Sequence, residues 1–279
     1  MRAAASEFDA KFLTGGSYRS PGFRPGLFTR IFPSLSFYGR LFGGPVFRLC
    51  RLAAKGLCDD SAWTRASVEV AELVERIGGK IVVEGMEAIT AVDGPCLFVA
   101  NHMSTLETFM LPGIIRPRRP VTFVVKNSLV AMPFFGMVMR SRDPVVVGRS
   151  SPREDLARVL EGGRERLGRG VSIIIFPQST RSPDFDLRRF NSIGVKLAMY
   201  ADVPIVPLAL KTDAWGQGKA VKELGKIRPE LTVRYRFASP LRIAGRGRED
   251  HAAICDHIAQ SLREWRRTDA ALLARNPLS

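Results

Sequence analysis

The sequence predicts an α/β fold in which helices flank a mostly parallel central sheet, with an N-terminal amphipathic helical segment in front of it. Three observations support this prediction. From residue 62 onward, short runs rich in Val and Ile alternate with stretches of helical periodicity. The run 171–176 is dominated by Val and Ile, which is typical of a strand covered on both faces. The 279 residues are 46% hydrophobic and 25% charged, so the chain is too apolar to be disordered.

The predicted strands and helices alternate, with no internal repeat or linker between them. Strands are expected over residues 80–84, 96–100, 121–126, 144–147, 171–176, 204–210 and 231–237. Helices are expected over residues 62–77, 129–139, 152–167, 189–200 and 250–267, and another from about residue 105. Ligands of such sheets lie beyond the carboxyl ends of the strands, so the segments after residues 100, 125, 147, 176 and 210 are the places to search for chemistry. The last of these, 211–219, either lines the groove or forms a turn with an exposed Trp215.

Residues 1–57 differ in composition from residues 58–279, and we expect them to form a separate membrane-docking segment. They hold nine basic and two acidic residues together with many Phe and Leu. A helix that begins at Pro45 would carry an apolar stripe with Val46 and Leu49, and a basic stripe of Arg48, Arg51 and Lys55. This pattern fits a helix at a lipid surface, and it fits equally an amphipathic helix packed on the protein. The aromatic side chains upstream favour lipid: Phe28, Phe32, Phe37 and Phe42.

Charge and cysteine usage limit the partners. The chain has 42 Lys and Arg against 27 Asp and Glu, a net charge of +15, which favours an anionic partner such as an acidic membrane surface or a phosphorylated molecule. No nucleic acid is expected, because the aromatic residues cluster with Leu and Pro instead of interleaving with basic residues. The four Cys are widely spaced and the three His are scattered, so neither disulfides nor a metal site is expected. Without a signal peptide or an apolar run of membrane-spanning length, we expect a peripheral protein on the cytoplasmic face of the membrane.

The first candidate motif follows the strand 96–100 and contains Asn101, His102, Ser104 and Glu107. A histidine at a strand end can accept a proton near neutral pH, and a carboxylate five residues later can reach back to orient it. The same residues also form a capping box, with Ser104 as the N-cap and Glu107 three positions later. The two interpretations are compatible, because the cap would hold the helix against which the pair is set.

The second candidate motif follows the strand 171–176 and reads Phe-Pro-Gln-Ser-Thr-Arg-Ser over residues 176–182. Backbone N–H groups, hydroxyls and the Arg181 guanidinium offer an anion several donors. A surface turn with a solvated arginine is the alternative.

Together these motifs resemble the glycerolipid acyltransferase family, which includes the bacterial lysophosphatidic acid (1-acylglycerol-3-phosphate) acyltransferases. Asn-His-x-Ser-x-x-Glu matches the family's first block and Phe-Pro-x-x-Thr-Arg-Ser its third. Lys126, Leu129, Gly136 and Arg149 reproduce the spacing of the second block, and residues 203–207 look like the fourth. The resemblance covers roughly residues 80–215, and the N-terminal segment looks like the membrane-docking helices of bacterial members.

The resemblance implies transfer of a fatty acyl group from acyl-CoA or acyl carrier protein to a hydroxyl of a lysophospholipid or glycerol phosphate, without a cofactor or metal. His102 would be the general base and Glu107 its partner. Lys126, Arg149 and Arg181 would receive the acceptor's phosphate. The other polar residues of the first and third blocks are expected to line the substrate site: Asn101, Ser104, Gln178, Ser179 and Thr180.

Two residues of the chain depart from the family's pattern. Glu107 stands where the family usually has Asp, which keeps the carboxylate. Gln178-Ser179 replaces the usual Glu-Gly, which removes an acid and puts the identity of the acceptor in question. A lipid-binding protein of the same fold that has lost turnover is therefore the alternative to an enzyme.

Overall fold

The computed structural model describes residues 11–13, 15–148, 151–178, 180–219 and 221–275. Within these residues the chain forms one eight-stranded sheet in the order β1-β2-β8-β7-β3-β6-β4-β5. The strands at the centre, from β7 to β5, run parallel to one another, whereas β1–β2 and β7–β8 are antiparallel pairs. The strands are β1 (Tyr18–Arg19), β2 (Ile81–Glu84), β3 (Leu97–Ala100), β4 (Val121–Lys126), β5 (Val145–Val147), β6 (Ser172–Ile175), β7 (Ile205–Lys211) and β8 (Val233–Phe237).

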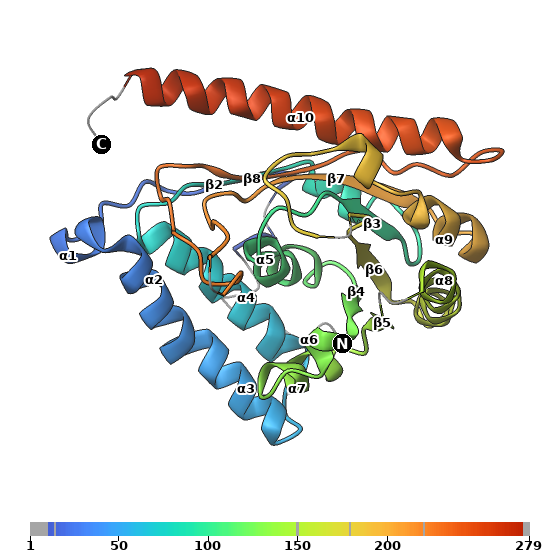
Figure 1. The fold of residues 1–279 in the computed structure, drawn as a ribbon, viewed down its shortest axis with the longest axis horizontal. Coiled ribbons are helices and arrows are strands. Elements are labelled where there is room, and N and C mark those ends of the chain that lie inside the picture. Colours follow the sequence, from blue (N-terminus) through green and yellow to red (C-terminus); the bar gives the residue numbers. More distant parts are fainter. Residues whose placement is uncertain (1–10, 14, 149–150, 179, 220, 276–279) are drawn as a thin grey trace.

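Helices cover both faces of this sheet, as Figure 1 shows. One layer contains α1 (Leu27–Ile31), α2 (Pro33–Leu41), α3 (Phe47–Ala54), α4 (Asp60–Arg76) and α5 (Leu106–Ile115). The other contains α8 (Pro152–Gly168), α9 (Ile193–Ala201) and the long α10 (Arg248–Arg275). Short helices η1 (Phe42–Val46), η2 (Met86–Ile89), α6 (Asn127–Val130), α7 (Phe135–Arg140) and η3 (Leu187–Arg189) complete the fold.

The alternation of side chains along β3 explains the two layers. Phe98 and Ala100 face the core under α4 and α5, and Leu97 and Val99 face the core under α9 and α10. All four are buried, as expected of a central strand in a sheet covered on both faces. The site motif after Ala100 therefore starts from one of the most enclosed strands of the molecule.

Local sequence signals fix several element boundaries. Asp59 caps α4 by accepting the Ala62 N–H at 2.7 Å. Gly85 follows β2 with a φ of +73°, and a Cβ there would lie 2.2 Å from the carbonyl oxygen of Phe237, so only glycine fits. The helix expected over 129–139 is two helices, α6 and α7, because the chain between them contains Pro133.

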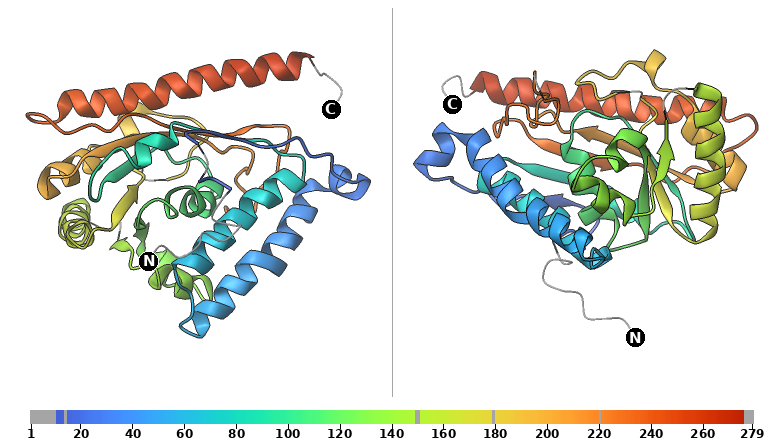
Figure 2. Two further views of the ribbon diagram at one scale, coloured as in Figure 1. Left: turned by 180° about the vertical axis from the view of Figure 1, so that it is seen from behind. Right: turned by 60° about the horizontal axis from the view of Figure 1, so that its bottom comes forward.

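The predicted division at residue 57 does not divide the fold. β1 joins the sheet as the antiparallel neighbour of β2, and Phe37 and Leu41 of α2 are buried in the main core. The expectation that Phe37 faces lipid is therefore wrong, since only 1% of it is exposed. Figure 2 shows the N-terminal helices running alongside α4.

The predicted helix from Pro45 is also different in detail. Pro45 lies inside η1, a turn that continues α2 into α3, and α3 begins at Phe47. All three residues of the expected basic stripe are exposed, and Arg48 also pairs with Glu69 on α4. Among the helices of the described residues, none is both long enough and apolar enough to cross a bilayer.

Candidate active site

The histidine and the glutamate of the first motif meet beyond the end of β3. His102 Nδ1 lies 2.9 Å from Glu107 Oε1, and the imidazole ring stacks on Phe176 with 4.3 Å between ring centroids. Glu107 is fully buried, whereas 16% of the His102 side chain is exposed. The Nδ1 edge of the His102 ring thus contacts a buried carboxylate, while part of the ring is exposed to solvent.

Several donors compensate the burial of the Glu107 carboxylate. Its Oε1 accepts the N–H groups of Met103 at 2.7 Å and Ser104 at 3.0 Å, and its Oε2 accepts the Thr212 hydroxyl. Burial raises the pKa of Glu107, but the hydrogen bond and charge of His102, the Thr212 hydroxyl and the Ser104 N–H outweigh it, and the net pKa lies below its usual value. Glu107 is therefore an ionised acceptor, so in the neutral form of the His102 imidazole the proton lies on Nδ1 and the lone pair on Nε2.

The predicted capping box is present only in part. Glu107 accepts the Ser104 N–H, but Ser104 Oγ accepts the Leu106 N–H at 3.1 Å and not the N–H of Glu107. The first helical residue of α5 is Leu106, so Thr105 rather than Ser104 occupies the N-cap position. The cap and the His–Glu pair share the same carboxylate.

Asn101 ties the end of β3 to β7. Its Nδ2 donates to the Leu210 carbonyl and its Oδ1 accepts the Leu210 N–H, both at 2.8 Å. Gln178, in the segment after β6, has its Oε1 on the His102 N–H at 2.7 Å. These two amides hold the His102 backbone between the strands on either side of β3.

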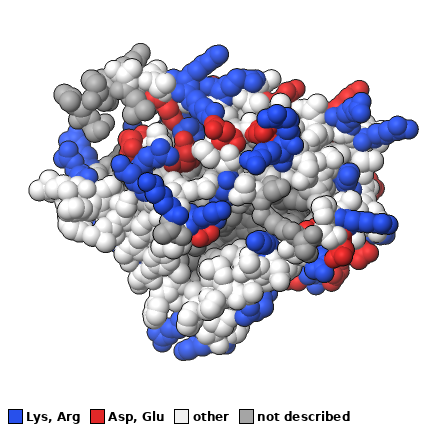
Figure 3. Space-filling model, in the orientation of Figure 1, with Lys and Arg blue, Asp and Glu red and all other residues white. Residues whose placement is uncertain are grey.

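Cationic side chains lie along the same edge of the sheet. Lys126 is the exposed last residue of β4 and makes no ion pair within the described residues. It lies two strands away from β3, a separation of about 10 Å. Arg181 contacts the Thr105 hydroxyl and pairs with Glu223 at 2.5 Å. Figure 3 shows a hollow over this part of the molecule with Lys and Arg on its rim.

Comparisons with known proteins agree with this geometry. Residues 80–211 match the Acyltransferase family. The chain is 33% identical over 147 residues to the 1-acyl-sn-glycerol-3-phosphate acyltransferase of Pseudomonas aeruginosa, covering 53% of this chain and 54% of that protein. It is 29% identical over 119 residues to the Escherichia coli protein of the same name, covering 43% of this chain and 48% of that one. Residues 80–211 belong to the acyltransferase family.

The fold of this acyltransferase domain is also found in a solved structure. The Thermotoga maritima crystal structure described as a 1-acyl-sn-glycerophosphate (LPA) acyltransferase aligns with a TM-score of 0.60 and 21% identity, covering 85% of this chain and 96% of that one. This likeness shows that the mostly parallel sheet with flanking helices is a fold shared with that protein. The matched segment spans less than two thirds of the curated relatives' length, 54% for the Pseudomonas aeruginosa protein and 37% for a Brassica napus protein.

The substrate-binding residues predicted from the sequence differ in their exposure. Asn101, Ser104 and Gln178 were expected to contact substrate, but each is at most 4% exposed and bonded within the protein, so they support the His102 loop instead. Lys126 and Thr180 are exposed and Arg181 is partly exposed, so these three remain available to a substrate. The other two predicted residues, Arg149 and Ser179, lie outside the described residues.

Sequence reasoning missed three contacts of the site. Thr212 donates to Glu107 from 105 positions away, Phe176 stacks on His102, and Glu223 pairs with Arg181. Phe176 lies inside the second motif, and Thr212 lies in the segment 211–219 that was expected either to line the groove or to form a turn. Nothing in the sequence indicated the partners of Thr212 and Glu223, because these partners come from distant parts of the chain.

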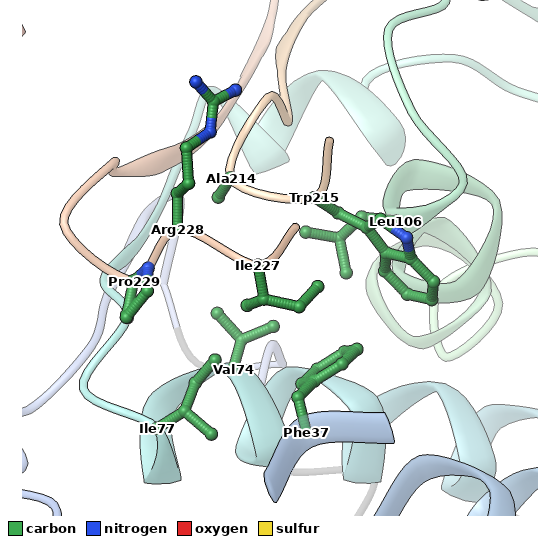
Figure 4. Close-up of a pocket in the computed structure, with 10 residues that line it drawn as sticks. Phe37, Val74, Ile77, Leu106, Ala214, Trp215, Ile227, Arg228 and Pro229 are labelled. Carbon is green, nitrogen blue, oxygen red and sulfur yellow. The ribbon is translucent and has the colours of Figure 1, made fainter. Parts of the chain in front are cut away.

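The segment after β7 is not an exposed turn. Trp215 is 3% exposed, and its ring stacks on Phe109 of α5 at 5.8 Å between centroids. Trp215 and Leu106 line an apolar cavity with Phe37 and Ile227, drawn in Figure 4. The cavity has room for about one water molecule, about 10 Å³, so an acyl chain does not fit there as the side chains stand.

Proposed function

We propose that the protein is a lipid O-acyltransferase that acylates 1-acylglycerol 3-phosphate in phospholipid synthesis, with acyl-CoA or acyl carrier protein as the thioester donor. The observation that carries the proposal is the His102–Glu107 pair. A fully buried, ionised carboxylate orients the ring, and the lone pair of Nε2 is left for a substrate hydroxyl. The names of the relatives support the choice of acceptor and reaction.

The proposed reaction is direct transfer. His102 Nε2 takes the proton of the acceptor hydroxyl while its oxygen forms a bond to the thioester carbonyl carbon. The carbonyl electron pair moves onto oxygen, where backbone N–H groups of residues 178–180 would stabilise it. When the oxyanion collapses, the C–S bond breaks, and the leaving thiolate takes the proton from the imidazolium. Glu107 stabilises the imidazolium between these steps.

The acceptor phosphate would bind at Lys126 and Arg181, with Arg149 as a third cation. Arg181 is already paired with Glu223, but 49% of the Glu223 side chain is exposed. Exposed ion pairs contribute about 0–1 kcal/mol, whereas a guanidinium holds a phosphate with two parallel, charge-assisted hydrogen bonds. A phosphate would therefore displace Glu223 at little cost.

We infer that the protein binds the membrane peripherally, on its cytoplasmic face, through α1 to α3. Part of these helices is buried in the core. The helices and the residues next to them also carry large apolar side chains that are about half exposed or more: Phe23, Leu27, Phe28, Ile31, Phe32, Leu35, Phe42 and Phe47. We call these eight residues the apolar face. Such an accumulation is larger than soluble monomers normally expose and suits insertion among lipid headgroups.

The test of the reaction is turnover of radiolabelled acyl-CoA with 1-acylglycerol 3-phosphate in vesicles. His102→Ala should lower kcat by about two to four orders of magnitude, as loss of a general base does, and Glu107→Gln should lower it less. The matched control is His251→Gln, because His251 lies on α10 away from the site. Wild-type turnover in His102→Ala would rule out the proposed mechanism. Binding of the lysolipid by the unaltered protein without any turnover would favour the lipid-binding alternative.

A further inference from the structure

Thr212 is a buried hydroxyl residue that comes directly after β7 and touches the His–Glu pair from the side opposite His102. It is 0% exposed, its hydroxyl donates to Glu107 Oε2, and its Oγ1 lies 2.9 Å from Ser104 Oγ. His102 contacts the other carboxylate oxygen, Oε1. Glu107 Oε1 thus contacts the imidazole, whereas Oε2 accepts the hydrogen bond from Thr212.

Two hydroxyl groups lie against Glu107 Oε2. The Ser104 hydroxyl is within hydrogen-bond distance of Glu107 Oε2, at 3.0 Å, and of Thr212 Oγ1, at 2.9 Å, while its Oγ accepts the Leu106 N–H at 3.1 Å. An ionised carboxylate can only accept, so the Thr212 proton points at Glu107. Where the Ser104 proton points at Thr212, it polarises the Thr212 hydroxyl and strengthens the bond from Thr212 to the carboxylate.

Thr212 is held in place independently of the loop that it serves. Leu210, two residues before Thr212, is fixed to the end of β3 by two hydrogen bonds with Asn101. Lys211 is buried and pairs with Asp213 at 2.8 Å and with Asp269 of α10 at 2.6 Å. The hydroxyl therefore approaches Glu107 from a rigid strand end, which is what a positioning group requires.

We propose that Thr212 is a positioning residue of the acyl-transfer site: it fixes the rotation and the ionisation of Glu107, so that Oε1 stays aligned with His102 Nδ1. The consequence for turnover rests on the proposed function above. The consequence for the His102–Glu107 hydrogen bond does not, because that bond exists in the free protein whatever reaction it serves.

The turnover experiment compares Thr212→Val, which keeps the shape and removes the hydroxyl, with Thr212→Ser, which keeps the hydroxyl. Thr212→Val should lower kcat about 10- to 100-fold with little change in the KM of either substrate, as expected for loss of a hydrogen bond to a charged group. Thr212→Ser should restore kcat. Thr122→Val is the control, because Thr122 is equally buried but donates to the Arg142 carbonyl, away from the site.

The second experiment uses no substrate. The chain has three histidines, so the ring resonances of ¹⁵N-histidine-labelled protein can be assigned with single variants. The His102 Nδ1 proton should be protected and shifted downfield in the wild type and in Thr212→Ser. In Thr212→Val it should move upfield or exchange faster, while His251 and His257 stay unchanged. Should Thr212→Val not fold, Thr212→Ala is measured in the same way.

An unchanged His102 resonance in folded Thr212→Val would overturn the proposal, and so would a Thr212→Ser variant as impaired as Thr212→Val, since that would point to the side-chain methyl. If the wild type shows the expected resonance pattern and no acyl transfer, the proposed reaction fails while the role of Thr212 stands.

Discussion

Glu107 shows how a single residue links folding to chemistry. A buried carboxylate is tolerated only where donors replace its water, and here four residues supply them: His102, Met103, Ser104 and Thr212. Glu107 also lies in the first turn of α5, so its charge suits the positive end of the helix. The same carboxylate therefore stabilises the start of α5 and orients His102.

The lowered pKa of Glu107 predicts a specific acid sensitivity. Because the folded pKa lies below the ordinary value of 4.5, the carboxylate stabilises the fold at pH values above 4.5, and this contribution is lost as the pH falls through the folded pKa. In Glu107→Gln the contribution is missing throughout. The difference in unfolding free energy between the two proteins should therefore shrink between about pH 6 and pH 3.

Urea unfolding at several pH values measures this difference. Acids that titrate in both proteins, such as Asp60 beside Arg116, whose hydrogen bond lowers its pKa, cancel in the comparison. A difference that stays constant with pH would mean that Glu107 titrates alike in the folded and unfolded chains.

The cations at the sheet edge predict a selective loss of acceptor binding. Arg181→Ala and Lys126→Ala should each raise the KM for 1-acylglycerol 3-phosphate about tenfold or more, because each removes a charge-assisted contact worth about 1.5–3 kcal/mol. The KM for acyl-CoA should change less. Arg188→Ala is the matched control, because Arg188 is 91% exposed and pairs only locally with Asp186. Equal changes for both substrates would assign these cations to the donor's phosphates or to structure.

At the scale of elements, α2 packs against the core with some residues and exposes another large apolar residue at the surface. Phe37 packs at 5.1 Å between centroids against Trp215, while Leu35, two positions away, is 63% exposed. Deleting the N-terminal segment would therefore remove core as well as surface. Substitutions confined to the apolar face separate the two roles.

The prediction for these helices concerns Phe28, Leu35 and Phe47, which are 58%, 63% and 61% exposed. Replacing all three with Ser should abolish co-flotation with anionic vesicles and leave the melting temperature nearly unchanged, since each side chain contributes about 1.5–3 kcal/mol only when it is buried in lipid. The control replaces Leu187 and Met199, which are exposed to 55% and 46% outside α1–α3. Flotation that persists in the triple variant would show that the apolar face is not the membrane contact.

At the scale of the whole molecule, local patterns explain which features could be predicted from sequence. Every strand from β2 to β8 was predicted to within a few residues. Central strands such as β6 are buried on both faces and therefore apolar, whereas in β8 Arg234 and Arg236 alternate with buried residues. The motif after β3 predicted the His102–Glu107 contact, because five positions span little more than one helical turn. Neither signal depends on distant parts of the chain.

The features that could not be predicted depend on long-range pairing. β8 runs antiparallel to β7 because of the way the chain connects the two strands. The residues of a strand do not indicate in which direction it will run in the sheet. The buried Trp215 and the exposed Phe47 are equally apolar residues, and only the packing of α2 and α5 decides between them. Glu223 reaches Arg181 across 42 positions, a distance at which charge patterns in sequence carry no information.

The contact between Thr212 and Glu107 has a consequence for the order in which a working site appears during synthesis. A ribosome releases the histidine and the glutamate more than a hundred residues before the hydroxyl that orients them. A nascent chain that has emerged only as far as β6 holds both members of the pair, but Glu107 lacks the Thr212 donor to its Oε2 and Asn101 lacks its partner strand. The site should therefore become active only late in synthesis, when β7 pairs with β3. Chains that end before β7 should remain inactive.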